Sequence, residues 1–216
     1  MAARGTRALA RLETPPASAD EKGRWADRLI ALAGLALLAL PLACVCLAIR
    51  LDSAGPAFFL QTRIGRQGRP FRIVKLRTMS QAGGTLRVTR LGAWIRRLGI
   101  DEVPQLVNVV LGDMALIGPR PLIAEDCHAY LSAGSSRFDV LPGITGLAQA
   151  TGRHLSPAHR DRLDRFYVRR RSPALDMVVL WRTLRVTLAA DRPPAAGTAH
   201  GPIPDRCCET APGAGD

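Results

Sequence analysis

The sequence predicts a small, irregular α/β protein, mostly helical, that carries an N-terminal membrane helix. Three observations lead to this class. The run from Leu29 to Ile49 holds 21 residues without a charge, which is long enough for a membrane segment. Two short apolar runs, Ala57 to Ile64 and Phe71 to Leu76, flank a turn rich in glycine and predict a pair of strands. Later segments repeat apolar residues at helical spacing, and the 216 residues suffice for one domain plus an appendage.

The membrane segment, residues 24–50, is predicted to be re-entrant, so that it enters the bilayer and returns on the same side. Six basic residues precede it within residues 1–28, and seven follow within residues 50–77. Lys and Arg near the ends of a membrane segment favour the cytoplasm, so both flanks favour the same side. Pro41 lies past the middle, where it can bend or interrupt the helix. This pattern favours a helix-break-helix over a simple span and over a cleaved signal peptide, whose apolar core is shorter.

The charge is concentrated directly after this segment. Residues 50–100 carry eleven positive charges and one negative, which is +10 of a total formal charge of +12. Its position beside the membrane favours lipid headgroups and phosphorylated ligands over DNA as the anionic partner. The five cysteines form no CxxC pair, so neither a disulfide framework nor a zinc site is predicted, and a reducing compartment fits best.

Two helices are expected next. The first places Val88, Leu91, Ile95 and Leu98 on one face with Trp94 beside them, which suits a helix in the membrane interface or one packed on a core. The second, over 101–112, has Pro104 in its first turn and ends at Gly112.

The rest of the chain is expected to add two helices, over about 157–170 and about 175–189. A stretch rich in Pro, Ala and Gly then predicts a disordered tail. The expected organisation is a basic flexible leader, the membrane helix, a domain that carries the function, and the tail, over residues 1–23, 24–50, 51–190 and 191–216.

Asp101 and Glu102 begin the helix over 101–112, where free backbone N–H groups favour anions, so helix capping alone explains them. An adjacent carboxylate pair beside a basic stretch can also divide its labour, one carboxylate as nucleophile and one as a ligand of Mg²⁺. Arg120 lies between two prolines and could offer a fixed fork to a phosphate, or belong to a plain turn. The loop of residues 142–149 could approach a nucleotide closely, or be another turn.

Six blocks of the sequence, in this order, resemble the bacterial sugar-transferase family, the monotopic phosphoglycosyl transferases, across about residues 24–190. One departure is Leu40 before Pro41, where the family often has serine. The blocks are Asp52–Phe59, Lys75–Met79, Asp101–Leu106, Gly112–Met114, Gly118–Pro121 and Pro142–Gln149.

The resemblance implies a monotopic enzyme of the inner membrane whose catalytic domain faces the cytoplasm. It further implies transfer of a sugar 1-phosphate from a UDP-sugar to a polyprenyl phosphate, with release of UMP. In the family pattern Asp101 forms a covalent aspartyl phosphosugar, and Glu102 helps to hold Mg²⁺, with Asp101 as a further candidate ligand.

Other site residues follow from the same pattern. Lys75, Arg77, Arg96 and Arg120 are expected to bind or position substrate phosphate, and the nucleotide loop is expected to use Gly143, Thr145, Gly146 and Gln149. Membrane lipids are expected partners, nucleic acid is not, and a homodimer is left open. The rival hypothesis is a basic, membrane-tethered protein without catalysis that binds nucleic acid or anionic lipid. Retention of Asp101, Glu102 and Arg120 favours the enzyme, while the sugar and its pathway stay open.

Overall fold

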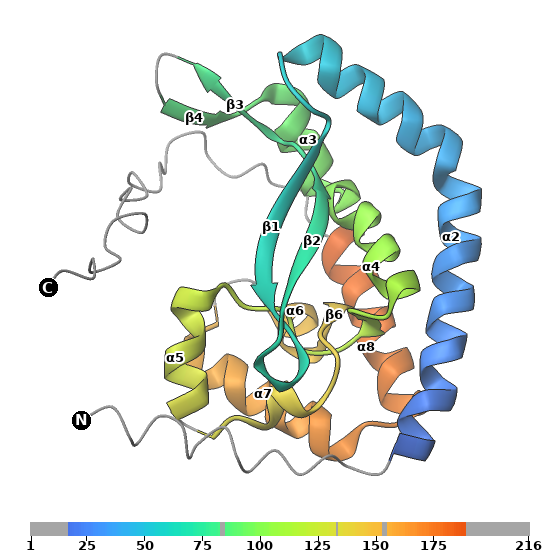
Figure 1. The fold of residues 1–216 in the computed structure, drawn as a ribbon, viewed down its shortest axis with the longest axis vertical. Helices are drawn as coiled ribbons and strands as arrows, with labels where there is room; N and C mark the ends of the chain where they lie inside the picture. The colour runs from blue at the N-terminus through green and yellow to red at the C-terminus, as the bar shows by residue number, and fades with distance from the viewer. Residues whose placement is uncertain (1–16, 83–84, 133, 153–154, 189–216) are drawn as a thin grey trace, which may run out of the picture.

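The computed structural model describes residues 17–82, 85–132, 134–152 and 155–188. Within these ranges, one long helix runs along the side of a domain made of short helices and three separate two-stranded sheets (Figure 1). The predicted mostly helical α/β class is therefore confirmed. Residues 1–16 of the predicted leader and the predicted tail, 191–216, lie outside the described residues.

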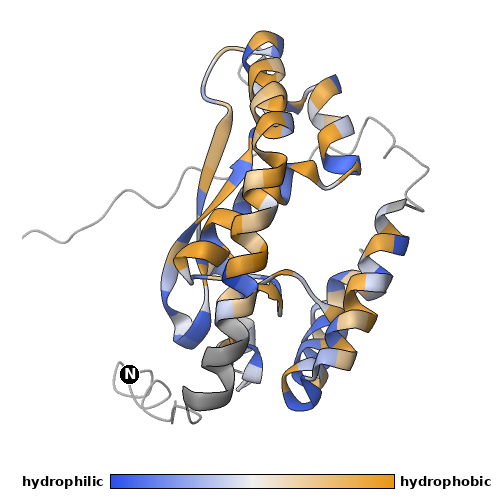
Figure 2. Ribbon diagram, turned by 90° about the vertical axis from the view of Figure 1, so that its right-hand side faces the viewer, coloured by the Kyte–Doolittle hydropathy of each residue, from blue (hydrophilic) through white to orange (hydrophobic). Residues whose placement is uncertain are grey.

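The long helix, α2 (Ala17–Asp52), has the properties of a membrane anchor. Within Trp25–Asp52 an 18-residue window has a mean hydropathy of 2.6, and only 6% of that window is buried. Figure 2 shows the hydrophobic residues concentrated along this helix. A core helix of such hydropathy would be covered by protein, so the exposed apolar surface suits lipid.

The structure has a continuous helix at Pro41, where the sequence predicted a break. The helix continues through Pro41 from Ala17 to Asp52, and its axis changes direction in its second half (Figure 1). A proline removes one backbone donor and crowds the preceding turn, which can bend a helix without separating it into two. The helix also begins before the expected boundary at residue 24 and ends two residues beyond residue 50.

The first sheet confirms the predicted strand pair. β1 (Phe58–Ile64) and β2 (Pro70–Leu76) are antiparallel, with Phe58 opposite Leu76 and Ile64 opposite Pro70. The connection contains η2 (Arg66–Gly68), where Gln67 has φ 56° and Gly68 has φ 72°. These left-handed residues reverse the chain, and glycine adopts that conformation without steric strain.

A second hairpin, β3 (Met79–Ala82) with β4 (Thr85–Val88), was not predicted. It places Val88 in a strand, so the expected membership of Val88 in a helical face is wrong. The helix α3 (Arg90–Arg97) begins one residue after Thr89, whose hydroxyl accepts a hydrogen bond from the Gly92 amide. An N-cap of this kind ends strand geometry and starts the helix. Ile95 of α3 is buried, whereas Trp94 is exposed.

The helix predicted over 101–112 is divided into η3 (Ile100–Gln105) and α4 (Leu106–Leu111). Gly99, with φ 69°, is the N-cap, so the expectation that Asp101 caps this helix is wrong. Gly112, with φ 91°, ends α4 as expected. A tight first segment followed by a short α-helix directs the two carboxylates differently from the regular helix that the sequence predicted.

A parallel pair joins two distant loops. β5 (Ala115–Ile117) pairs with β6 (Gly143–Thr145), and between them lie α5 (Ala124–Ser132) and η4 (Ser136–Asp139). The backbones approach so closely that a Cβ on Gly143 would lie 2.1 Å from the nitrogen of Gly118, and one on Gly146 2.2 Å from its oxygen. Close packing against Gly118 therefore explains why positions 143 and 146 have no side chain.

The C-terminal helices are α6 (Leu147–Thr151), α7 (Pro157–Arg170) and α8 (Pro173–Leu188), and the last two confirm the helices predicted there. Apolar contacts join the helices to the rest. The buried residues Leu147, Ala150, Tyr167 and Val179 form one cluster between α6, α7 and α8. Ala31 of α2 packs with another cluster, which holds Ile73, Val109 and Met114.

Candidate active site

A cleft of about 570 Å³ brings the two carboxylates together with residues from the far end of the chain. Asp101 and Glu102 reach it from η3, and Arg120 reaches it from the segment after β5. The opposite part of the lining comes from β6 and the C-terminal helices. The lining residues are Arg96, Leu98, Gly99, Asp101, Glu102, Val103, Leu106, Arg120, Ile144, Thr145, Ala148, Gln149, Gly152, Arg160, Thr183, Val186 and Thr187.

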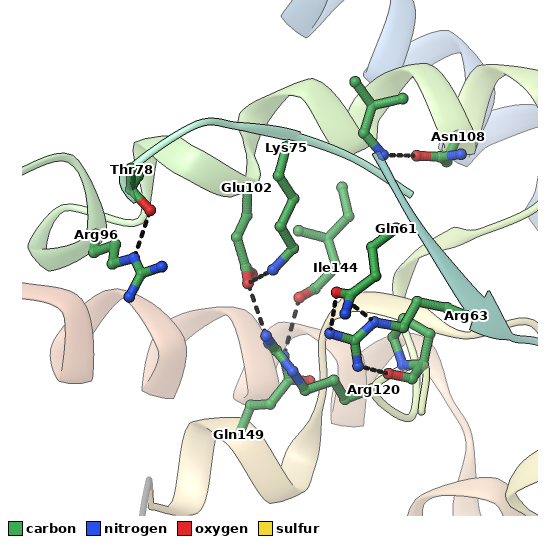
Figure 3. A network of polar contacts seen from close by, with 12 residues as sticks. Gln61, Arg63, Lys75, Thr78, Arg96, Glu102, Asn108, Arg120, Ile144 and Gln149 are labelled. Atoms are coloured by element: carbon green, nitrogen blue, oxygen red, sulfur yellow. Dashed lines mark hydrogen bonds and ion pairs between the residues drawn. The ribbon is translucent and has the colours of Figure 1, made fainter. Parts of the chain in front are cut away.

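Glu102 is held by two cations (Figure 3). Its Oε1 accepts a hydrogen bond from Lys75 Nζ at 2.8 Å and another from Arg120 NH2 at 3.0 Å. The side chains are 22%, 15% and 38% exposed for Glu102, Lys75 and Arg120, so the network lies at the wall of the cleft rather than in open solvent. Charge-assisted bonds of this kind fix the carboxylate and the guanidinium relative to each other.

The same surroundings move the pKa values of the two carboxyls in opposite directions. Burial raises the pKa of Glu102, but the charges and hydrogen bonds of Arg120 and Lys75 outweigh it, so the pKa is lowered overall. Burial and the neighbouring charge of Glu102 raise the pKa of Asp101, although Lys75 and Arg96 oppose them. Adjacent carboxyls with diverging pKa values are typical of functional sites in which each has its own role.

Arg96 is positioned by Thr78, a buried residue at the end of the first hairpin. The Arg96 Nε donates to Thr78 Oγ1 at 2.6 Å, and Figure 3 shows this pair beside the Glu102 network. The backbone of α3 lies against Thr78, since a Cβ on Gly92 would be 2.1 Å from the Thr78 carbonyl oxygen. The glycine thus allows the close approach that brings Arg96 to the cleft.

Lys75 is positioned by a side chain that the sequence analysis missed. The buried Asn108 of α4 accepts a hydrogen bond from the Val74 amide at 3.1 Å (Figure 3). It also donates to the Arg72 carbonyl at 2.7 Å, so it pairs with an edge of β2. These two hydrogen bonds replace a neighbouring strand and hold β2, with Lys75, against α4. The available signal was an amide among the apolar residues of 106–111.

Arg77 does not join the cleft, although the sequence grouped it with the phosphate-binding residues. Its guanidinium donates to the carbonyl oxygens of Ala54 at 2.6 Å and Ser53 at 2.6 Å, and to that of Ile49 at 3.2 Å. These carbonyls lie at and just beyond the C-terminal end of α2, which attracts cations. Arg77 therefore ties the anchor helix to the first hairpin.

Only part of the predicted nucleotide loop reaches the cleft. Thr145 and Gln149 line the cleft, whereas Gly143 and Gly146 serve the close packing against Gly118 described above. The Gln149 side chain donates to the Ile144 carbonyl at 3.1 Å (Figure 3).

Three polar side chains of the cleft were not predicted: Arg160 from α7, and Thr183 and Thr187 from α8. Thr183 and Thr145 share a hydrogen bond of 2.7 Å between their hydroxyls, which joins α8 to β6. The sequence offered no signal for these residues, because they lie well over fifty positions from Asp101 and belong to ordinary amphipathic helices.

The carboxylates of the cleft offer part of the oxygen ligand set that Mg²⁺ requires. Among the described residues, no group of three or more His, Cys, Asp or Glu side chains is placed to hold a metal ion. Mg²⁺ commonly takes one or two carboxylates together with substrate phosphates and water. Asp101 and Glu102 fit that requirement when a phosphorylated substrate supplies further oxygens.

The family model "Bacterial sugar transferase" matches residues 21–190. The chain is 41% identical over 152 residues to "Uncharacterized sugar transferase EpsL" of Bacillus subtilis, covering 66% of this chain and 75% of that protein. It is 45% identical over 151 residues to the UDP-glucose:undecaprenyl-phosphate glucose-1-phosphate transferase of Caulobacter vibrioides, covering 64% of this chain and 57% of the relative.

A third relative is the UDP-N-acetylgalactosamine-undecaprenyl-phosphate N-acetylgalactosaminephosphotransferase of Aeromonas hydrophila. It is 36% identical over 182 residues, which cover 76% of this chain and 43% of that protein. The match thus spans about half the length of these last two relatives, and three quarters of the Bacillus protein.

Proposed function

This chain belongs to the bacterial sugar transferase family, and on that premise we propose that it transfers a sugar 1-phosphate from a UDP-sugar to a polyprenyl phosphate. The reaction would begin the assembly of an exopolysaccharide, an O-antigen or another glycan. The observation that carries the proposal is the meeting of Asp101, Glu102 and Arg120 in one cleft of a protein with an apolar anchor helix. One substrate is soluble in water and the other in lipid, and a cleft in a membrane-anchored domain would be accessible to both.

Asp101 is the proposed nucleophile. Its carboxylate attacks the sugar-bearing phosphorus, an aspartyl O–P bond forms, and the bond to the bridging oxygen breaks so that UMP leaves with the electron pair. A phosphate oxygen of the polyprenyl phosphate then attacks the same phosphorus and returns the carboxylate of Asp101. The covalent intermediate allows the two substrates to use one site in turn. Because burial and Glu102 raise its pKa, Asp101 is a more basic nucleophile than an exposed aspartate.

Arg120 and Arg96 are the proposed electrostatic partners of the phosphates. A carboxylate approaches a diphosphate against charge repulsion, and fixed guanidinium groups stabilise the charge that develops during phosphoryl transfer. Arg120 is oriented by Glu102, and Arg96 is oriented by Thr78. Lys75 keeps Glu102 ionised and in place.

Mg²⁺ is the proposed cofactor, and Glu102 and Asp101 are the residues that would hold it with the diphosphate oxygens of the donor. When bound, it supplies positive charge that offsets the repulsion between carboxylate and phosphate. The hydroxyls of Thr145, Thr183 and Thr187 lie in the part of the lining that is proposed to receive the nucleotide. Hydroxyl and amide groups of this kind suit ribose and base hydrogen bonding better than additional charge would.

The membrane arrangement is proposed to be monotopic, in the inner membrane, with the catalytic domain in the cytoplasm. Both flanks of α2 are basic, and Lys and Arg near membrane segments favour that side. The bend in α2 would let the helix enter the bilayer and return. The basic first hairpin would then lie near the anionic lipid surface and the phosphate of the acceptor.

The experiment is UMP release by membranes that contain the protein, measured with a panel of UDP-sugars in the presence and absence of polyprenyl phosphate. The expected result is Mg²⁺-dependent release with at least one UDP-sugar, and its absence in the matched Asp101→Asn membranes. Failure with every UDP-sugar, together with salt-sensitive retention on duplex DNA, would favour the rival binding function instead.

A further inference from the structure

A second arginine lies directly behind Arg120. Arg137 belongs to η4, and its side chain is only 2% exposed, as is that of Asp164 on α7. A charged group that is buried to this extent is stable only with several partners, because removing it from water is unfavourable. The partners of Arg137 therefore indicate why the charge is there.

Its guanidinium contacts the Arg120 backbone, the Asp164 carboxylate and the rings of Tyr130 and Phe138. NH2 donates to the backbone carbonyl of Arg120 at 2.7 Å. The same nitrogen lies 3.3 Å from Oδ2 of Asp164. The guanidinium carbon, Cζ, lies 4.5 Å from the ring centre of Tyr130, on α5, and 6.0 Å from that of Phe138, which suits cation–π contacts.

The bond to Arg120 fixes a peptide that both flanking prolines already restrict. The segment before it is held by the Gly118 amide, which donates to the Thr145 carbonyl at 2.8 Å, and by the Gly143 amide, which donates to the Pro119 carbonyl at 3.0 Å. Arg137 adds a contact at Arg120 itself. The backbone of Arg120 is thus held from the interior, while its guanidinium faces Glu102 in the cleft.

The contact with Asp164 extends this link to another wall of the cleft. Asp164 and Arg160 lie four positions apart on α7, and Arg160 lines the cleft. A chain of contacts therefore runs from α7 through Arg137 to Arg120 and Glu102.

We propose that Arg137 is a positioning residue, which sets the backbone of Arg120, and through it the direction of the Arg120 guanidinium, from a buried pair with Asp164 and a ring contact with Tyr130. The proposal rests on the proposed function, since Arg120 is there the partner of the transferred phosphate. A residue that only stabilised η4 against α7 would affect folding without a special relation to Arg120.

The test is a double-mutant cycle of Arg137→Lys and Arg120→Ala, with kcat and KM for UMP release and the melting temperature of each variant. Arg137→Lys is expected to lower kcat roughly ten- to hundredfold, as small displacements of catalytic groups do, with a smaller change in KM. In the Arg120→Ala background the same change is expected to leave kcat unaltered, while it lowers the melting temperature in both backgrounds. Equal losses of kcat in both backgrounds would overturn the proposal.

A readout that does not need activity accompanies the cycle. Amide hydrogen exchange in residues 115–122 is expected to rise in Arg137→Lys, because the Arg120 peptide loses its interior contact. Unchanged exchange there would also overturn the proposal. An inactive wild type with the expected exchange result would instead contradict the proposed function alone.

Two further variants complete the design. Arg165→Ala is the matched control. It removes the 2.6 Å ion pair between Arg165 and Asp161, which lie on α7, the helix that also holds Asp164. It is expected to leave kcat unchanged. If Arg137→Lys does not fold, Asp164→Asn keeps the shape of the pair, leaves Arg137 present, and is expected to show the same pattern in the cycle and in exchange.

Discussion

Replacement of Arg120 tests whether its guanidinium acts as a clamp, which fixes the position of a phosphate, or only adds to the positive potential of the cleft. Arg120→Ala removes an ion pair of 3.0 Å between side chains that are 38% and 22% exposed. Lys75 remains 2.8 Å from the same oxygen of Glu102, so the carboxylate keeps one partner. The free energy of unfolding is therefore expected to fall by less than about 1 kcal/mol, the value of a solvent-accessible pair. In a protein of this size that corresponds to a shift of about 2–4 °C or less in melting temperature.

The effect on activity is expected to be much larger. Loss of one fixed donor that stabilises a developing charge lowers kcat by about 10²–10³, which is about 2.7–4 kcal/mol. Arg120→Lys is expected to come within about tenfold of that loss, because an ammonium keeps the charge but not the planar fork, which contacts Glu102 and is proposed to bind phosphate as well. The measurement is UMP release for both variants at low and high salt, with melting temperatures alongside.

The control is Arg87→Ala, since Arg87 is an exposed arginine on β4 that does not line the cleft. It is expected to change activity little at any salt concentration. Near-normal activity of Arg120→Lys, with a loss in Arg120→Ala that fades as salt is raised, would refute the clamp. Screening acts over about 8 Å at physiological ionic strength, so a field effect would disappear in this way.

The remaining predictions use the carboxyls and the anchor. Asp101→Asn is expected to abolish UMP release and the covalent label from a UDP-sugar while the melting temperature stays close to that of the wild type; near-normal turnover would exclude a nucleophile. Glu102→Gln is expected to raise the Mg²⁺ concentration needed for half-maximal activity, and an unchanged requirement would argue against a ligand role. Pro41→Ala is expected to straighten α2, so a cysteine near the N-terminus, labelled only from the cytoplasm in the wild type, should become labelled from outside; labelling from outside in the wild type would exclude re-entry. Burial raises the pKa of Asp164 from 3.8 to about 6 although Arg137 opposes it, so this carboxyl contributes stability that is present below pH 3.8 and lost as pH rises through about 6. Asp164→Asn should remove that part of the pH dependence in denaturant titrations, and an unaltered profile between those pH values would contradict it.

Features carried by neighbouring residues could be predicted from the sequence. The apolar length of residues 29–49, the short apolar runs that form β1 and β2, and the helical spacing that forms α7 and α8 are local patterns. The carboxylates of Asp101 and Glu102 could also be identified as a pair, because they are adjacent in the sequence.

Features that depend on packing could not be predicted. Val88 has the spacing of a helical residue but lies in β4, because Thr89 caps α3 one position later and the β3 strand pairs with it. Asp101 has the sequence of an N-cap, but Gly99 takes that place in the left-handed conformation. In both cases two local solutions are close in free energy, and contacts made elsewhere decide between them.

The sequence by itself determined an apolar anchor followed by a basic α/β domain with two candidate catalytic carboxylates. It placed Arg77 and Arg96 in the same basic stretch and gave no reason to assign them different roles. The tertiary structure alone decided between these arginines: Arg77 meets the carbonyls at the end of α2, and Arg96 meets Thr78 beside the cleft. It also added Arg160 and placed Arg137 behind Arg120. The physical reason is that a charged side chain acts through the groups it meets, and those groups come from segments far apart in sequence whose approach is set by the packing of the whole core.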